Sequence, residues 1–168
     1  MKKKQHETII HPLKPLYSSG SRVLILGSFP SIKTREYGFF YGHPQNRFWP
    51  IMEVLFDTKL TRDIEERKNF ILEKKLALFD SIFQCDIIGS SDASIEKVVP
   101  SDLSSVFQEA SIQKVFCNGG TSHKYYKKYH EKKYGIKAEV LPSSSPANAR
   151  YRLDDLVEKW KIILEYVK

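Results

Sequence analysis

One short segment, residues 40–49, carries two side chains that can take part in bond-breaking chemistry. Asn46 has a carbonyl oxygen that can hold a water molecule and an NH2 group that can donate a hydrogen bond to a leaving group. His43 can orient a leaving group or a phosphate, although a histidine before a proline is as often structural. The alternative for Asn46 is a cap on a helix that begins near Arg47, because Asn is favoured at helix N-caps.

Two other segments are suited to binding anions. The serines at positions 143–145 are small hydrogen-bond donors of the kind that contact phosphates. Residues 119–122 open a predicted helix, and the free N–H groups of a helix N-terminus attract anions. The lysines of that helix add positive potential, with an ordinary solvated face as the alternative for each: Lys124, Lys127, Lys128, Lys132 and Lys133.

The charge balance favours a polyanionic partner. The 168-residue chain has 27 Lys and Arg against 20 Asp and Glu, a formal net charge of +7. A basic surface attracts nucleic acid through counterion release, but many basic proteins owe their charge to a generic surface. The two cysteines, Cys85 and Cys117, are too few for a four-cysteine iron–sulfur or zinc site, and the histidines are scattered. We therefore expect no metal and no cofactor.

The chain shows no pattern typical of a membrane or secreted protein. Its longest strongly apolar stretch, Val23–Leu26, is far too short to span a bilayer. No apolar secretory core follows the charged N-terminus. We expect a soluble monomer in the cytoplasm, associated with the nucleoid if the source is bacterial.

The hydrophobic pattern predicts an alternation of strands and helices. Short apolar runs indicate buried strands at residues 22–27, 76–80, 114–117 and 137–141. Helical patterns occupy residues 47–56, 63–75, 102–110, 121–133 and 153–167. This order predicts a three-layer α/β/α sandwich with a central four-stranded parallel sheet. We expect a single domain over residues 1–168, in which the Pro-containing residues 1–20 form an N-terminal arm.

The loops that follow the four strands are the expected location of a site. They comprise residues 27–49, 80–95, 118–122 and 142–150, and all are polar and rich in Gly, Pro or Ser. The carboxyl ends of parallel strands meet at one edge of the sheet, where such folds bind ligands. We therefore expect Asn46 and His43 to lie near the two anion-binding segments.

Several of these segments resemble the uracil-DNA glycosylase superfamily. Gly27–Ser31 is similar to its Gly-x-x-Pro turn, and His43–Trp49 is similar to the H-P-x-N-R-F-W run of its mismatch-specific branch. Leu141–Arg150 resembles the loop that enters DNA beside a flipped base. The middle segments resemble the branch that contains hypoxanthine-DNA glycosylases: Phe79–Asp80, Gly89–Ser90 and Asp92. With Asn118–Gly119, the matches span nearly the whole chain in order.

The resemblance implies roles for particular residues. Phe29 stands where the superfamily has its usual catalytic Asp or Asn, and a phenyl ring cannot polarise water. The hypoxanthine branch also lacks that residue and is associated with the Asn of the H-P-x-N run, here Asn46. Tyr41 stands where relatives stack an aromatic ring on the base. Asp80 stands where they place a base-recognising side chain, with bracing of a loop as the alternative.

The contacts implied by the resemblance fall into two sets. The first set, expected to bind the base, comprises Gly27, Ser28, Phe29, Pro30, Tyr41, His43 and Asp80. The second set, expected to bind DNA, comprises Asn118, Gly119, Gly120, Thr121, Ser143, Ser144, Ser145, Pro146, Ala147, Asn148 and Arg150. Within it, Pro146 and Ala147 are expected to form a small wedge that replaces the flipped base.

The function implied is that of a monofunctional DNA glycosylase in base excision repair. It would flip a deaminated base out of damaged DNA and hydrolyse the N-glycosidic bond, with hypoxanthine first, and uracil and xanthine behind it. No lysine lies at an identifiable Schiff-base position, so strand cleavage is not expected. Two alternatives remain open. Phe29 favours a catalytically silent DNA-binding module, and a small-molecule nucleoside hydrolase on the same sheet would be indifferent to salt.

Overall fold

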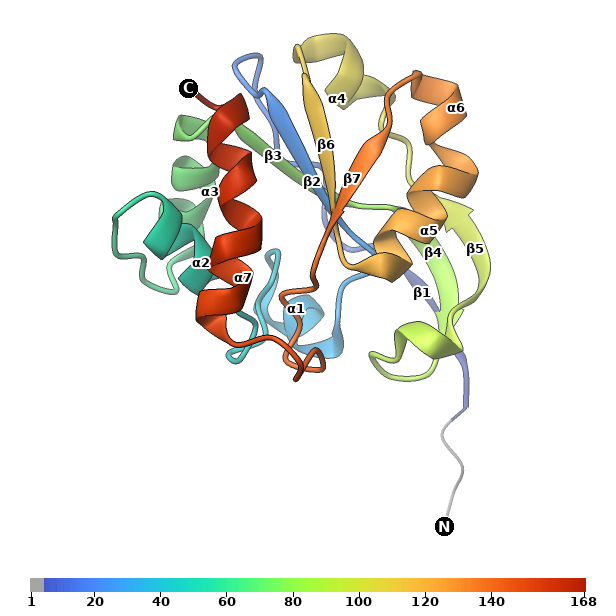
Figure 1. Ribbon diagram of the computed structural model, residues 1–168. Coiled ribbons are helices and arrows are strands. Elements are labelled where there is room, and N and C mark those ends of the chain that lie inside the picture. Colours follow the sequence, from blue (N-terminus) through green and yellow to red (C-terminus); the bar gives the residue numbers. More distant parts are fainter. Residues whose placement is uncertain (1–4) are drawn as a thin grey trace.

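The centre of the fold is a four-stranded parallel sheet (Figure 1). The computed structural model describes residues 5–168. Its strands are β2 (Val23–Gly27), β3 (Leu76–Asp80), β6 (Lys114–Asn118) and β7 (Ala138–Leu141). They pair in the order β3-β2-β6-β7, and every neighbouring pair is parallel. The prediction of a central four-stranded parallel sheet is therefore confirmed.

Helices surround this sheet. They are α1 (Ile32–Tyr37), α2 (Phe48–Leu55), α3 (Ile64–Glu73), α4 (Ser104–Glu109), α5 (Gly120–Tyr129), α6 (Glu131–Tyr134) and α7 (Leu153–Trp160), which continues into the 3-10 helix η2 (Lys161–Tyr166). In Figure 1, α2, α3 and α7 stand on one side of the sheet, and α5 and α6 stand on the other. This arrangement confirms the three-layer α/β/α architecture. No helix among residues 5–168 has the length and apolar character needed to cross a membrane.

The main core lies between the sheet and the helices. All residues of β2 are buried, and the ring of Phe48 in α2 meets that of Trp160 in α7 edge-on at 5.8 Å. Truncating such a side chain to Ala costs about 3–5 kcal/mol, so this packing strongly constrains the positions of both helices. The indole N–H of Trp160 also donates to the carbonyl of Pro142 at 2.9 Å. The last helix therefore anchors the loop that follows β7.

A second sheet, antiparallel and three-stranded, was not anticipated. It comprises β1 (Glu7–Ile10), β4 (Ile82–Ile87) and β5 (Glu96–Pro100) in the order β1-β4-β5. The predicted loop at residues 80–95 is thus largely β4 and the short 3-10 helix η1 (Asp92–Ser94). In β4 the residues Ile82, Cys85 and Ile87 are buried at uneven spacing, and two register shifts interrupt its pairing with β5. A strand with such irregular burial lacks the alternation by which strands are recognised.

The described part of the predicted N-terminal arm packs into the fold, while residues 1–4 lie outside the described residues. β1 pairs with β4, and the His11 amide donates to the Phe83 carbonyl at 2.7 Å. Leu16 then forms an antiparallel bridge with Leu78 of β3. These contacts carry the chain past the end of β3 and bring the His11 side chain to Asp80.

Candidate active site

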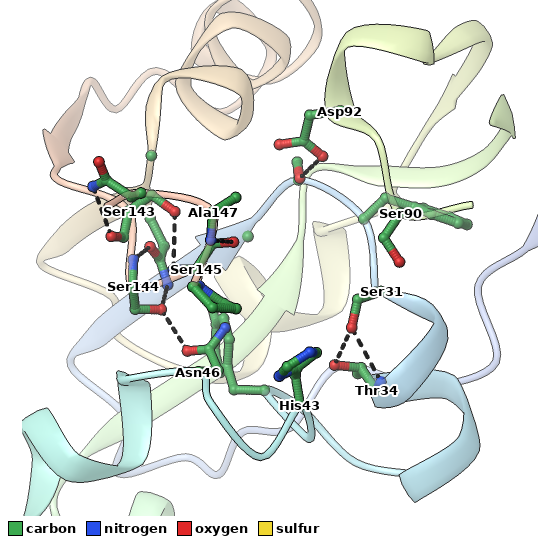
Figure 2. A pocket seen from close by; sticks show the side chains of 18 of the residues that line it. Ser31, Thr34, His43, Asn46, Ser90, Asp92, Ser143, Ser144, Ser145 and Ala147 are labelled. Atoms are coloured by element: carbon green, nitrogen blue, oxygen red, sulfur yellow. Dashed lines mark hydrogen bonds between the residues drawn. The ribbon is translucent and has the colours of Figure 1, made fainter. Parts of the chain in front are cut away.

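A cleft of about 1150 Å³ opens at the carboxyl ends of the parallel strands. All four expected loops contribute residues to its lining. Of the residues expected to contact the base or DNA, all line the cleft except Thr121 and Arg150. Figure 2 shows Asn46 and the 143–147 loop on one wall of the cleft, and Ser31, Ser90 and Asp92 on the opposite wall.

Asn46 is held by helix α2 and by the loop that follows β7. Its Oδ1 accepts hydrogen bonds from the Phe48 amide at 2.9 Å and from the Ser144 hydroxyl at 2.8 Å (Figure 2). The bond to Phe48 satisfies the first amide of α2 from the residue before its N-cap, Arg47, so Asn46 forms the local turn that precedes this helix. A carbonyl oxygen has two lone pairs, and both are used. Within residues 5–168 the Nδ2 group of Asn46 makes no hydrogen bond, so it is available to donate into the cleft.

Asn118, at the end of β6, fixes the direction of these bonds. Its Nδ2 donates to Ser144 Oγ at 2.9 Å, and its Oδ1 accepts from the Ser144 amide at 2.9 Å. Because Ser144 Oγ accepts from Asn118, its hydroxyl proton is free to point at Asn46. Asn118, Ser144 and Asn46 thus form a relay of side chains across three elements, and this relay orients the Asn46 amide. Ser144 is fully buried and its hydroxyl is used within the protein, which argues against the phosphate contact expected of it.

Arg47 was not anticipated from the sequence. Its guanidinium donates to the carbonyls of Ser145 at 2.6 Å, Asn148 at 2.9 Å and Tyr151, and its Nε reaches the Ser144 carbonyl at 3.4 Å. Its backbone amide also donates to the Ser144 carbonyl at 3.0 Å. These bonds clamp the loop after β7 onto the start of α2. Nothing in the sequence indicated the partners of Arg47, because backbone carbonyls occur at every residue and are not marked by any residue type.

The tip of the clamped loop is shaped by its own side chains. Ser143 Oγ accepts from the Ser145 amide at 3.1 Å, and Ser145 Oγ accepts from the Ala147 amide at 3.2 Å. Asn148 Nδ2 donates to the Ser143 carbonyl at 3.0 Å. These turns leave Pro146 and Ala147 exposed at the rim of the cleft, while Arg150 lies outside the lining.

Gly119 allows the 143–147 loop to approach closely. Its φ of +95° lies in a region that side-chain-bearing residues rarely adopt, and an added Cβ would lie 3.1 Å from the Cβ of Ser143. Its amide donates to the Leu141 carbonyl at 2.9 Å. Gly120 begins α5 with open space at its Cα. The start of α5 therefore meets the cleft through backbone rather than side chains.

His43 and Tyr41 come from the loop before α2. His43 Nδ1 accepts from the Gln45 amide at 3.0 Å, which leaves Nε2 to carry the proton and makes it a donor at the cleft. Tyr41 stacks on Phe48 with centroids 4.1 Å apart, so one face of its ring is covered. The Tyr41 hydroxyl is buried without a partner among the described residues, and burial raises the pKa of this phenol.

Phe29 and Asp92 lie in contrasting surroundings. Phe29 is buried in an apolar cluster with Ile82 and Cys85, so the position of the superfamily's usual catalytic residue is occupied by core packing. The Asp92 carboxylate accepts from the Ser28 hydroxyl at 3.0 Å at the rim of the cleft (Figure 2). Loss of hydration at this wall raises the pKa of Asp92, and the hydrogen bond from Ser28 opposes the rise.

Asp80 ends β3 at the floor of the cleft, in register with Gly27 of β2. Its Oδ2 lies 2.6 Å from His11 Nε2, and both side chains are buried. An added Cβ on Gly27 would lie only 2.4 Å from Asp80 Oδ1, so a side chain there would displace this carboxylate. No sequence pattern pointed to His11, which lies 69 residues away in the predicted arm. Among residues 5–168, no three His, Cys, Asp or Glu side chains gather where they could hold a metal ion.

The fold and the cleft together define a parallel α/β domain with a ligand site at the carboxyl ends of its strands. The sequence profile of the uracil DNA glycosylase superfamily matches residues 15–167, so the chain belongs to that superfamily. It is accordingly a DNA N-glycosylase, a hydrolase of N-glycosyl bonds.

Similar proteins occur in two species of Methanosarcina. The chain is 29% identical over 132 residues to a hypoxanthine DNA glycosylase of Methanosarcina acetivorans, covering 78% of this chain and 83% of that protein. It is 28% identical over 141 residues to a hypoxanthine DNA glycosylase of Methanosarcina barkeri, covering 81% and 86%. A solution NMR structure from M. acetivorans, assigned provisionally to the uracil DNA glycosylases, has a TM-score of 0.77 at 23% identity and covers 98% of both chains. At that identity the likeness shows the fold.

Proposed function

We propose that this protein releases hypoxanthine from DNA by flipping the damaged nucleotide and hydrolysing its N-glycosidic bond, as a single-domain monomer acting in base excision repair. The Methanosarcina relatives that bear this activity in their names support hypoxanthine as the first substrate, ahead of uracil and xanthine. The observation that carries the proposal is the Asn46 amide, which Ser144 orients and whose Nδ2 has no partner at the cleft among residues 5–168.

The chemistry requires charge stabilisation at the leaving base. Breaking the bond leaves an anionic base and a cationic sugar, and a preoriented donor stabilises the anion as it forms. Asn46 Nδ2 is the donor that fits this task, because its carbonyl is already occupied and cannot hold water. His43 Nε2 is a second donor from the same loop. Removing one such donor typically lowers kcat by about 10²–10³-fold.

The remaining cleft residues suit base and DNA binding. The uncovered face of Tyr41 can stack on the base, and the amides of Ser28 and Phe29 can read its edge. Asp80 accepts a hydrogen bond from the base rather than merely bracing a loop. Pro146 and Ala147 fill the space that the base vacates, and the start of α5 binds a phosphate through its backbone amides.

The test is release of base from duplexes that contain hypoxanthine, uracil, xanthine or a G:T mismatch. Asn46→Asp keeps an oxygen for Phe48 and Ser144 but removes the donor, so it should lower hypoxanthine release about 10²-fold or more while the Phe48 amide keeps its acceptor. Asn46→Ala should lose both. Asn69→Ala, an exposed position on α3 away from the cleft, is the matched control and should retain full activity.

Other outcomes separate the alternatives. Unchanged release by Asn46→Asp would keep the enzyme and discard the role of Asn46. DNA binding without release of any base would support the silent module favoured by Phe29. Hydrolysis of free inosine that is insensitive to salt would support the nucleoside hydrolase.

A further inference from the structure

The His11–Asp80 pair has a fixed direction. His11 Nδ1 accepts a hydrogen bond from the Leu13 amide at 3.0 Å, so this nitrogen carries no proton. The proton of the neutral ring then sits on Nε2, which lies 2.6 Å from Asp80 Oδ2 and donates to it. The bond is an N–H donated to one carboxylate oxygen, and it holds that oxygen against the imidazole.

The surroundings of His11 hold this arrangement in place. The imidazole packs among the rings of Phe29, Phe40 and Phe79, with centroids 5.8, 6.3 and 4.6 Å away. Its side chain is fully buried, so it does not reach a ligand in the cleft. Besides its ring contacts with Phe29 and Phe40, which line the cleft, the polar contact of His11 with the cleft runs through Asp80.

The second oxygen of Asp80 is left for a ligand. Among residues 5–168, Asp80 Oδ1 accepts no hydrogen bond, and it lies over the bare Cα of Gly27 in the lining of the cleft. The titratable groups coupled to Asp80 on its other sides are the Tyr41 phenol and the Asp92 carboxyl, which do not neutralise a carboxylate. Oδ1 is thus an acceptor held at the floor of the cleft.

From this geometry, and resting on the proposed function, we infer that His11 is a specificity-determining positioning residue. It holds Asp80 as an acceptor for the ring N–H that deamination creates on the pairing edge of a base. Adenine and cytosine present an unprotonated ring nitrogen there, whereas hypoxanthine and uracil present an N–H to a pocket that reads this edge. An acceptor facing an acceptor leaves a buried polar group unpaired, and sites of this kind can discriminate by about 10⁴–10⁵-fold.

The inference is tested by the ratio of single-turnover release rates for hypoxanthine and 1-methylhypoxanthine, which lacks the N1 proton. His11→Phe keeps a flat ring among the three phenyl rings but removes the donor to Asp80. It should reduce the ratio at least about tenfold. His11→Gln, which can still donate from its amide, should restore most of the ratio. In an Asp80→Asn background, His11→Phe should change the ratio no further, because His11 acts through that carboxylate.

An equal slowing of both substrates by His11→Phe in a folded protein, or no rescue by His11→Gln, would overturn the inference and reduce His11 to a structural residue. Thermal unfolding of each variant checks the fold; if His11→Phe does not fold, the ratio in His11→Gln and in Asp80→Asn decides. An Asp80→Asn ratio equal to that of the wild type would also overturn it. Failure of the wild type to release hypoxanthine is seen before any substitution and overturns the proposed function instead.

Discussion

At the scale of single residues, the cleft depends on buried hydrogen bonds that leave selected atoms unused. The Asn118–Ser144–Asn46 relay leaves Asn46 Nδ2 free, and the His11–Asp80 bond leaves Asp80 Oδ1 free, among the residues that the structure describes. In both cases a second side chain, Ser144 or His11, binds one atom of the polar group and thereby orients the other atom toward the cleft. Preorganisation of this kind removes the cost of orienting a donor during the reaction.

Ser144→Ala tests the relay. It removes the hydroxyl that donates to Asn46 and accepts from Asn118, so the Asn46 amide should lose its fixed direction. We expect kcat for hypoxanthine release to fall about tenfold or more with little change in DNA affinity, because a misplaced catalytic group slows chemistry without weakening binding. Stability should fall by about 1–3 kcal/mol in urea unfolding, since a buried polar group loses its partner.

The matched control for this change is Ser21→Ala. Ser21 is also fully buried, and its hydroxyl also makes two hydrogen bonds, to the Leu76 carbonyl and from the Ser18 amide, away from the cleft. It should cost similar stability while leaving kcat intact. Equal losses of kcat in both variants would mean that Ser144 acts through stability alone.

The sequence indicated which residue types could do chemistry but not how they are paired. Asn46 was found because its segment carries a specific pattern. The sequence offered a cap and a donor as alternatives, but Oδ1 serves the helix and Nδ2 is left to donate, so the two roles do not exclude each other. His11 and Arg47 could not be found in this way. The partner of His11 is 69 residues away, and the partners of Arg47 are backbone carbonyls about 100 positions along the chain, which no residue type reveals.

Among the elements, the loop after β7 is fastened to the start of helix α2 by the hydrogen bonds of Arg47. Four carbonyls of the loop converge on one guanidinium group, and the last helix adds the bond from Trp160 to Pro142. The loop that carries Pro146 and Ala147 is therefore held on both sides. The wedge proposed above for Pro146 and Ala147 requires a rigid loop, because ordering the loop on binding would cost affinity.

Arg47→Met should release this loop. The variant keeps an apolar stem of similar length but loses the side-chain bonds to Ser145, Asn148 and Tyr151, each contributing about 0.5–1.5 kcal/mol. We expect faster amide hydrogen exchange over residues 143–151, together with weaker DNA binding and slower base release. Arg22→Met, at the amino end of β2, should change none of these. Unchanged exchange in Arg47→Met would show that α7 holds the loop without the clamp.

The elements themselves were predictable where burial is uniform and not where it is irregular. The strands β2 and β3 are continuous apolar runs because both faces of the sheet are covered there, whereas β7 is only partly buried. β4 and β1 carry no such run, since β4 alternates unevenly and β1 is mostly exposed. Because the antiparallel sheet brings His11 to Asp80, missing this sheet also meant missing the His11–Asp80 pair at the site.

In the molecule as a whole, the formal net charge is +7, and exposed lysines bring part of this positive charge to the cleft. Lys33 of α1 and Lys159 of α7 both line the cleft from opposite ends of the chain, and both side chains are exposed. Under the proposed function, a duplex docked over the cleft would meet these cations on either side of the flipped base. We therefore expect the DNA backbone to pass close to Lys33 and Lys159.

Salt dependence tests that placement. Removing a cation that binds one phosphate should reduce the slope of log K against log salt by about 0.9, so Lys33→Ala and Lys159→Ala should each flatten the slope and weaken binding to any duplex, damaged or not. Lys68→Ala is the control for Lys33, because each pairs with a glutamate three residues away on its own helix, and exposed Lys59 is the control for Lys159. Both controls lie on the α2–α3 side, outside the cleft lining. Slopes measured by fluorescence anisotropy that fall equally in all four variants would point to a diffuse basic surface, whereas a change confined to Lys33 and Lys159 would place the backbone across the cleft.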